Sequence, residues 1–397
     1  MSTLSRNTSE NITPAYWSGV FAMTLCIFVL IASEFMPVSL LTPIARDLQV
    51  TEGLAGQGIA ISGALAVLTS LTISTIAGNV NRKYLLLGMT ILMAISGVII
   101  ALSSSYLIYM TGRALIGIVI GGFWSMSAAV AIRLVPPHQV ARALAIFNGG
   151  NALAAVMAAP LGSYLGATIG WRGAFMCLIP VAVVAFIWQC FSLPDMDSNK
   201  APQSRGSVFT LLSRPIIVIG MLACGLFFMG QFALFTYIRP FLETVTQVET
   251  SGLSWILFII GIAGFIGTLV ITSFLNTGFY QTLIAIPLMM AAIAGMLILS
   301  GQSIWIVTLL FGFWGMLATA APTGWWTWIA RILPEDAEAG GGLMVAVIQL
   351  SIALGSTAGG LVFDNFGWQT TFGMSAVLLF SAVVLTFITS RQSNSIG

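Results

Sequence analysis

Charged residues are scarce in this chain. Asp, Glu, Lys and Arg make up only 7% of its 397 residues, whereas 58% are hydrophobic. A soluble domain contains about 25% charged residues, so a chain this poor in charge cannot cover a surface that faces water. We therefore expect it to face lipid. Its length passes the roughly 250–300 residues at which single cores stop growing, which favours two structural units.

Histidine and cysteine are almost missing as well. His138 is the only histidine, which excludes a histidine-based metal site. The net charge of +2 argues against a nucleic-acid partner, which would need a basic surface. Four cysteines lie in apolar runs without C-x-x-C spacing and are interpreted as buried thiols: Cys26, Cys177, Cys190 and Cys224.

Long apolar runs dominate what is present. A spanning helix needs about 20 mostly apolar residues. By that length we predict an all-α membrane protein with twelve transmembrane helices in two pseudo-symmetric six-helix bundles, residues 1–194 and 214–397, joined by a cytoplasmic linker at 195–213. The expected spans are 17–42, 53–77, 83–102, 106–133, 139–166, 172–194, 213–238, 251–275, 280–300, 303–329, 339–364 and 367–390.

Lysine and arginine are distributed unevenly between the loops, which predicts the orientation. With a cytoplasmic N-terminus, only Arg46, Arg172 and Arg239 lie on the outer side. Both termini are therefore expected in the cytoplasm. The cytoplasmic side then carries ten basic residues: Arg6, Arg82, Lys83, Arg133, Arg142, Lys200, Arg205, Arg214, Arg331 and Arg391.

The two halves of the sequence repeat one another at an offset of 197 or 198 residues. Six spans separate the repeats, so both halves have the same orientation, and such a duplication places a site at the midplane between them. The matching pairs are EFMPVSLLTP (34–43) with QFALFTYIRP (231–240), IRLVPP (132–137) with ARILPE (330–335), and GWRGAF (170–175) with GWQTTF (367–372).

Two motifs carry a family resemblance. The span 106–133 contains GRALIGIVIGGFW, with Arg113, Gly117 and Gly121 in an R-x-x-x-G-x-x-x-G pattern. The span 139–166 contains AAPLGSYLG, in which Pro160 and Gly162 are similar to the glycine-proline motif of exporters. Together with the spans and the repeat, these motifs resemble the major facilitator superfamily over the whole chain. The resemblance implies that superfamily's fold and transport by alternating access.

Within that superfamily, four segments look like the drug/proton antiporter family, and most like the bacterial purine ribonucleoside efflux transporters. Sugar and arabinose exporters share the EF-x-P pattern, so a sugar or multidrug substrate stays open. The segments are EFMPVSLLTPIARDL, GGFWSMSAAVAIRLVPP, GQFALFTYIRP and GWWTWIARILPEDAEAGG with the following VAVIQL.

Glu34 is the only acid deep within a predicted span. A charge at the bilayer centre costs about 2.5–3.5 kcal/mol on insertion scales, which protonation or pairing avoids. We interpret Glu34 as a proton carrier; a structural glutamate is the alternative. Arg113 lies at similar depth. At 1.5 Å per residue it is about 10 Å from the outer end of its span, and Glu34 is about 13 Å from the outer end of the first span. Arg113 is the expected partner, unless it only ties helices together. Pro37 and Pro43 remove backbone donors near Glu34 and soften that helix.

Aromatic and amide side chains in the central spans are the candidates for binding a substrate. A purine nucleoside offers a flat ring to stack on and polar edges to hydrogen-bond. Packing between helices is the alternative role for each residue. Trp328 is interpreted as an interfacial anchor. The candidates are Trp124, Asn148, Asn151, Gln231, Phe235, Tyr237, Trp325, Trp326 and Gln349.

These features favour a proton-coupled exporter of purine ribonucleosides, with a small-molecule substrate, protons and the bilayer as its partners. We expect a bacterial inner-membrane protein. No ATPase motif is present, so we expect no cofactor and a proton gradient as the energy source. An enzyme is not expected, because one buried acid without histidine offers no catalytic set. A passive facilitator remains the other class. Each chain contains both halves, so a monomer suffices.

Overall fold

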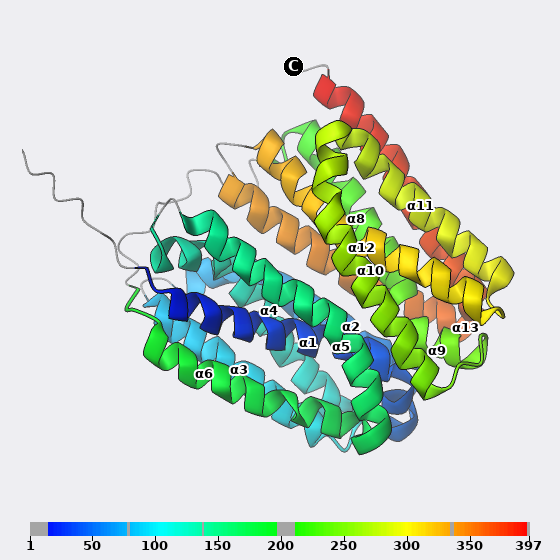
Figure 1. The fold of residues 1–397 in the computed structure, drawn as a ribbon, viewed down its shortest axis with the longest axis horizontal. Helices are drawn as coiled ribbons and strands as arrows, with labels where there is room; N and C mark the ends of the chain where they lie inside the picture. Colours follow the sequence, from blue (N-terminus) through cyan, green and yellow to red (C-terminus); the bar gives the residue numbers. More distant parts are fainter. Residues whose placement is uncertain (1–14, 78–79, 137–138, 197–210, 334–336, 395–397) are drawn as a thin grey trace, which may run out of the picture.

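The computed structural model describes residues 15–77, 80–136, 139–196, 211–333 and 337–394, and these residues are helical with short connections. The helices form one group from α1 to α6 and a second from α8 to α13 (Figure 1). Their bounds are α1 Trp17–Leu48, α2 Glu52–Ala77, α3 Arg82–Ala101, α4 Tyr106–Leu134, α5 Val140–Met176, α6 Leu178–Ser192, α8 Pro215–Phe235, α9 Ile238–Thr244, α10 Thr250–Thr277, α11 Phe279–Ser300, α12 Ile304–Ile332 and α13 Ala337–Asn394.

Ten segments of the described chain are long and apolar enough to cross a membrane, and two of them are double. These two run over Arg142–Ser192 and Gly340–Ser393, with 51 and 54 residues, where one crossing takes about 20. Each is broken by a glycine with positive φ, Gly170 at 77° and Gly367 at 80°. Only glycine adopts that conformation without strain. The twelve predicted spans are therefore confirmed, and the repeated Gly-Trp pair marks a turn in each half.

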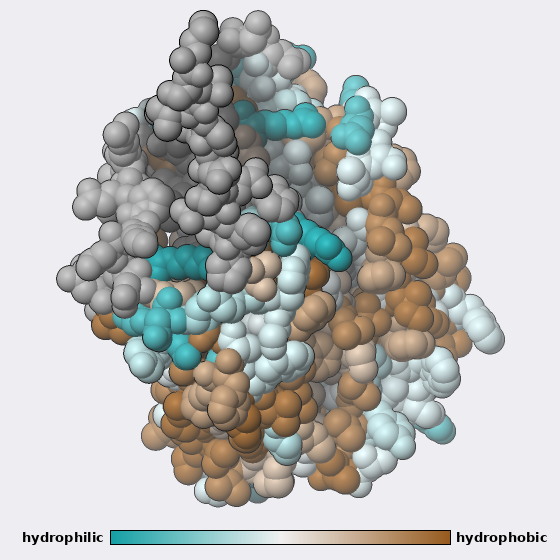
Figure 2. All heavy atoms as spheres, turned by 60° about the vertical axis from the view of Figure 1, so that its left-hand side comes forward, coloured by the Kyte–Doolittle hydropathy of each residue, from teal (hydrophilic) through white to brown (hydrophobic). Residues whose placement is uncertain are grey.

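Each group of helices has its own apolar core. Residues such as Phe123 and Phe147 lie in the core of the first group, and Phe311 and Trp314 lie in that of the second. The outward faces are also apolar, with exposed residues such as Phe191 and Leu299. Figure 2 shows brown, hydrophobic flanks below an end where hydrophilic side chains gather. A surface of this kind fits a lipid environment.

Two interpretations of single residues are wrong. Trp328 is 1% exposed and packs its ring against Gly220 of α8, so it is a core residue and not an interfacial anchor. The interpretation of the cysteines as buried thiols is confirmed for Cys26 and Cys224. It is wrong for Cys177, which is exposed, and Cys190 is half-buried. Cys177 lies where α5 passes into α6, on a surface that apolarity alone could not distinguish from the core.

Helices α2 and α4 pack unusually closely. A side chain added at Gly117 would collide with the main-chain oxygen of Ser62, and one at Gly121 with that of Ala66. Small residues that let two backbones approach are a main source of helix association in membranes. The glycines of the R-x-x-x-G-x-x-x-G pattern therefore bring Arg113, on the same helix, within reach of α2.

Substituting Gly117→Ala is expected to destabilise the protein by roughly 1–3 kcal/mol, the usual cost of overpacking a tight contact. Its matched control is Gly88→Ala, where an added Cβ meets nothing within 4 Å and the helix gains propensity. Thermal unfolding in detergent measures both. Equal melting temperatures for the two variants would contradict close α2–α4 packing.

The two groups of helices meet along α2 and α13 and along α5 and α10. Contacts between them run from Gly53 and Gly360, near the α1–α2 connection, to Gly63, where an added Cβ would lie 2.9 Å from the oxygen of Gln349. Gly261 of α10 packs against the main chain of Val156 in α5. We call the end at the α1–α2 connection, residues 48–52, the closed end.

Candidate functional site

Proline 37 creates the first element of the site. In a continuous helix the N–H of residue 37 would donate to the carbonyl of Ser33. Proline has no N–H, so that carbonyl in the buried part of α1 needs another donor. Arg113 of α4 supplies it, with Nη1 donating to the Ser33 oxygen at 2.7 Å. The proline-broken helix thus holds the arginine in place.

Three further hydrogen bonds use the other two nitrogens of Arg113. Nε donates to the carbonyl of Gly58 at 3.0 Å, and Nη2 donates to Ser62 Oγ at 3.1 Å and to the Glu34 carbonyl at 3.4 Å. The side chain is 0% exposed. A planar guanidinium presents its donors in a fixed fork, which suits acceptors from two helices at once. Arg113 therefore joins α1, α2 and α4 beneath Glu34.

The carboxyl group of Glu34 points to the other half of the protein. Glu34 is 5% exposed, and its carboxyl group faces the Gln349 side chain of α13. The charge of Arg113 acts on this carboxyl group, although the hydrogen bond from Arg113 goes to the Glu34 main chain. Glu34 and Arg113 are therefore neighbours, although among the described residues no ion pair joins their side chains, and Gln349 approaches the carboxyl group from the second half.

Aromatic rings of both halves meet at positions next in sequence to Glu34 and Gln231. Phe35 of α1 stacks on Phe232 of α8, with centroids 6.0 Å apart and planes at 22°, and Phe235 packs edge-on against Phe232 at 6.2 Å. Gln231, next to Phe232, and Gln349 each have a buried Oε1 without a hydrogen-bond partner among the described residues. Buried amide oxygens without partners point to a ligand or water as their partner.

The remaining candidates differ in their exposure. Trp124 and Asn151 are half-buried in the first half, whereas Asn148 and Trp326 are exposed. Trp325 is 2% exposed and packs edge-on against Trp328 in the core of the second half.

Tyr237 lies at the closed end. Its hydroxyl donates to the Ser356 carbonyl at 2.8 Å, and its ring stacks on Phe363. A side chain on Gly56 of α2 would collide with that hydroxyl. Tyr237 therefore joins helices of both halves instead of lying beside Glu34.

The sequence patterns did not identify Phe35 and Phe232 as candidates. The repeat held their signal, because they occupy equivalent positions in EF and QF, and equivalent residues near the pseudo-twofold axis meet each other. Their apolar character concealed them, since phenylalanine is common throughout the spans.

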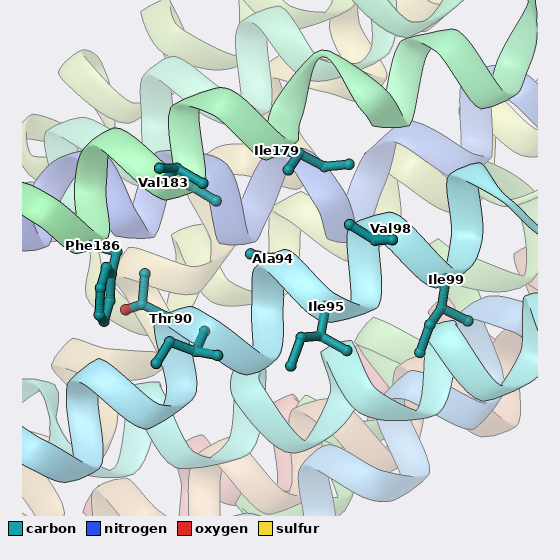
Figure 3. A pocket seen from close by; sticks show the side chains of 10 residues that line it. Thr90, Ala94, Ile95, Val98, Ile99, Ile179, Val183 and Phe186 are labelled. Carbon is teal, nitrogen blue, oxygen red and sulfur yellow. The ribbon is translucent and has the colours of Figure 1, made fainter.

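Two cavities lie outside this centre. One, of about 400 Å³, is an apolar groove between α3 and α6 lined by residues such as Ile95 and Val183 (Figure 3). Its one polar residue, Thr90, uses its hydroxyl on Leu86 and Gln189. This groove suits an acyl chain and not a polar substrate. The other, of about 600 Å³, lies at the closed end and is lined by charged residues including Arg239.

Two bundles of spanning helices with a buried acid and unpartnered amides between them are typical of a membrane transporter. The model of the Major Facilitator Superfamily matches residues 23–341, which is most of the chain. The chain belongs to this superfamily, and it is accordingly a transporter and not an enzyme.

Several known proteins are similar along nearly the whole chain. "Transcription regulatory protein OpdE" of Pseudomonas aeruginosa is 62% identical over 96% of both chains. The "Purine ribonucleoside efflux pump NepI" of Salmonella enteritidis is 38% identical over 94% of this chain and 93% of its own.

Solved structures share the fold. A bacterial homolog of the human lysosomal transporter Spinster, in an inward-facing and unoccupied conformation, matches with a TM-score of 0.74 at 17% identity over 95% of this chain and 97% of its own. A D-xylose-proton symporter matches with a TM-score of 0.76 at 15% identity over 94% and 98%.

Proposed function

We propose that this protein is a proton-coupled exporter of purine ribonucleosides and their analogues, acting as a monomer in the bacterial inner membrane. The observation that carries the proposal is the position of Glu34, a buried acid between the two halves with Gln349 facing it. A group that gains and loses a charge at this interface changes the energy of bringing the halves together.

The orientation of the closed end follows from the distribution of basic residues. Positive charge concentrates on the cytoplasmic side of membrane proteins, which assigns the closed end to the outside. The contacts between halves then seal the outer side, and the central site faces the cytoplasm. In this state substrate enters from the cell and a proton leaves Glu34 inward. In the opposite state a proton enters from outside and favours release of the substrate.

Chemistry and likeness support a nucleoside as substrate. Phe35, Phe232 and Phe235 supply aromatic faces, and Gln231 and Gln349 supply amides with unused oxygens. Purine rings can stack on the phenylalanine rings, and ring amino groups or ribose hydroxyls can donate hydrogen bonds to the glutamine oxygens. The 38% identical relative bears the name of a purine ribonucleoside efflux pump.

The name of the 62% identical relative refers to transcription. Direct DNA binding does not suit this chain, because its net charge is only +2 and its outward faces are apolar. An effect on transcription would arise indirectly here, by changing the cellular concentration of a transported small molecule that a regulator senses.

Transport by purified protein in vesicles tests the proposal. We expect labelled purine ribonucleosides to move against their gradient from the more alkaline side of the membrane to the more acidic side, where they accumulate. A protonophore should stop accumulation. Pentoses and cationic dyes serve as competing substrates. Export of dyes or pentoses without any export of nucleosides would refute the nucleoside as substrate. Accumulation that persists in the presence of the protonophore would refute proton coupling.

A further inference from the structure

Pro43, further along α1, has the same effect as Pro37: it frees a buried main-chain carbonyl. In a continuous helix the N–H of residue 43 would donate to the carbonyl of Ser39. Pro43 lies inside α1 and has no N–H, so the Ser39 carbonyl is left to another donor. Ser39 is 0% exposed, and a carbonyl buried there must find a partner within the protein.

The partner comes from the other half. Nη1 of Arg239, on α9, donates a hydrogen bond to the Ser39 oxygen. Arg239 is 6% exposed, and its Nε donates to Glu243 Oε1 at 2.8 Å, one turn further along α9. Glu243 therefore orients the guanidinium and offsets its charge, while the Nη1 group reaches across to α1. Hydrogen bonds with a charged donor are about twice as strong as neutral ones.

A second contact seals the same end. Asp364 of α13 accepts hydrogen bonds from Thr51 Oγ1 at 2.5 Å and from the N–H of Gly53 at 3.0 Å. These groups begin α2, and a carboxylate is stabilised at a helix N-terminus by the unpaired N–H groups and the helix dipole. Both contacts join the two halves at the closed end, so both must break if that end opens.

Water can reach the arginine contact. A cavity of about 600 Å³ at the closed end is lined by Pro43, Arg46, Arg239 and Glu243. A guanidinium that leaves the Ser39 carbonyl can therefore be hydrated instead of remaining a bare buried charge. This lowers the cost of breaking the contact, which suits an interaction that forms and breaks repeatedly.

We propose that Arg239 helps to hold the outer end shut, alongside the Asp364 contact, by donating to the carbonyl that Pro43 frees. It sets the balance between the two orientations of the central site without contacting substrate itself. This inference rests on the proposed transport function for its purpose. The conformational balance can nevertheless be measured without substrate or proton gradient, so the two proposals can fail separately.

Spin labels at Ser104→Cys and Gln302→Cys report the separation of the halves at the closed end. These positions are exposed in the α3–α4 and α11–α12 connections. The accessible Cys177 and Cys190 are replaced by serine in this background. We expect Arg239→Gln to move the ratio of long to short distances by about tenfold toward the long ones, the effect of losing one charge-assisted hydrogen bond.

Pro43→Ala gives an independent test that does not endanger folding. It restores the N–H that engages the Ser39 carbonyl within α1, so it should shift the distances in the same direction as Arg239→Gln. The double variant should shift them by less than the sum of the two, because both changes remove one interaction. Arg46→Gln is the matched control, since Arg46 lines the same cavity but is exposed.

Wild-type distances in both Arg239→Gln and Pro43→Ala would overturn the proposal. An equal shift in Arg46→Gln would overturn it too, because the effect would then follow from surface charge alone. Opening by the Arg239 and Pro43 variants in a protein that moves no nucleoside would leave the closing role intact and refute the proposed substrate.

Discussion

Glu34→Gln is expected to abolish proton-driven export. Glutamine has nearly the same shape as protonated glutamic acid and donates and accepts hydrogen bonds, but it cannot lose a proton. The contact with Gln349 can persist, so the variant should fold and bind substrate. Accumulation driven by a pH gradient should fall to the level of vesicles without protein, whereas substrate binding measured by calorimetry should remain.

The matched control for this change is Glu52→Gln. Glu52 lies in the first turn of α2, near the closed end and away from the centre. The change removes a favourable helix-dipole interaction of about 0.3–1 kcal/mol and should leave coupling intact. Full pH-driven accumulation by Glu34→Gln would show that another group carries the proton.

Arg113→Lys is the second change with a large expected effect. Lysine keeps the charge but replaces a planar fork by a point charge. An ammonium group cannot serve the carbonyls of Ser33 and Gly58 together with Ser62 Oγ, as the guanidinium does. Each buried acceptor left without a partner costs about 1–3 kcal/mol. We expect a lower melting temperature together with a loss of coupled transport.

Arg142→Lys provides the comparison, because Arg142 is exposed and lies over the ring of Trp17. Its replacement should change neither quantity measurably, since exposed contacts of this kind contribute about 0.5–1 kcal/mol. If Arg113→Lys retains both the wild-type melting temperature and coupled transport, then the arginine fork is not needed to hold Glu34 in place.

The prolines of α1 have a common physical role. Each removes a main-chain donor, and the carbonyl four residues earlier is then available to an arginine. Pro37 frees an acceptor for Arg113 within the first half, and Pro43 frees one for Arg239 across to the second half. Helix α1 is thereby tied both to the site and to the outer contact, which allows events at Glu34 to affect opening.

Much of the fold could be predicted from the sequence. The bilayer requires helices of about 20 apolar residues, so hydropathy alone locates the twelve spans. The repeat of Gly-Trp at 170 and 367 also marked the turns that separate the last two spans of each half. The importance of Glu34 followed as well, because a lone acid in an apolar span is costly and needs a reason.

Most of the site's neighbours could not be predicted. Gln349 and Tyr237 were both candidates, yet one faces Glu34 and the other lies at the closed end. Trp325 and Trp328 resembled cavity or interface residues but pack in the core of the second half. Sequence gives the depth of a residue in the membrane; it does not give the direction in which the side chain points.

The sequence by itself determined the membrane class, the spans, their duplication and the depth of the single central acid, because lipid imposes the same length and polarity rules on every span. Only the tertiary structure decided which faces meet. In water an amphipathic pattern shows the buried face of a helix, but in a bilayer the core and the lipid are both apolar. The pairing of Ser33 with Arg113 and of Ser39 with Arg239 therefore depends on how helices rotate and pack against one another.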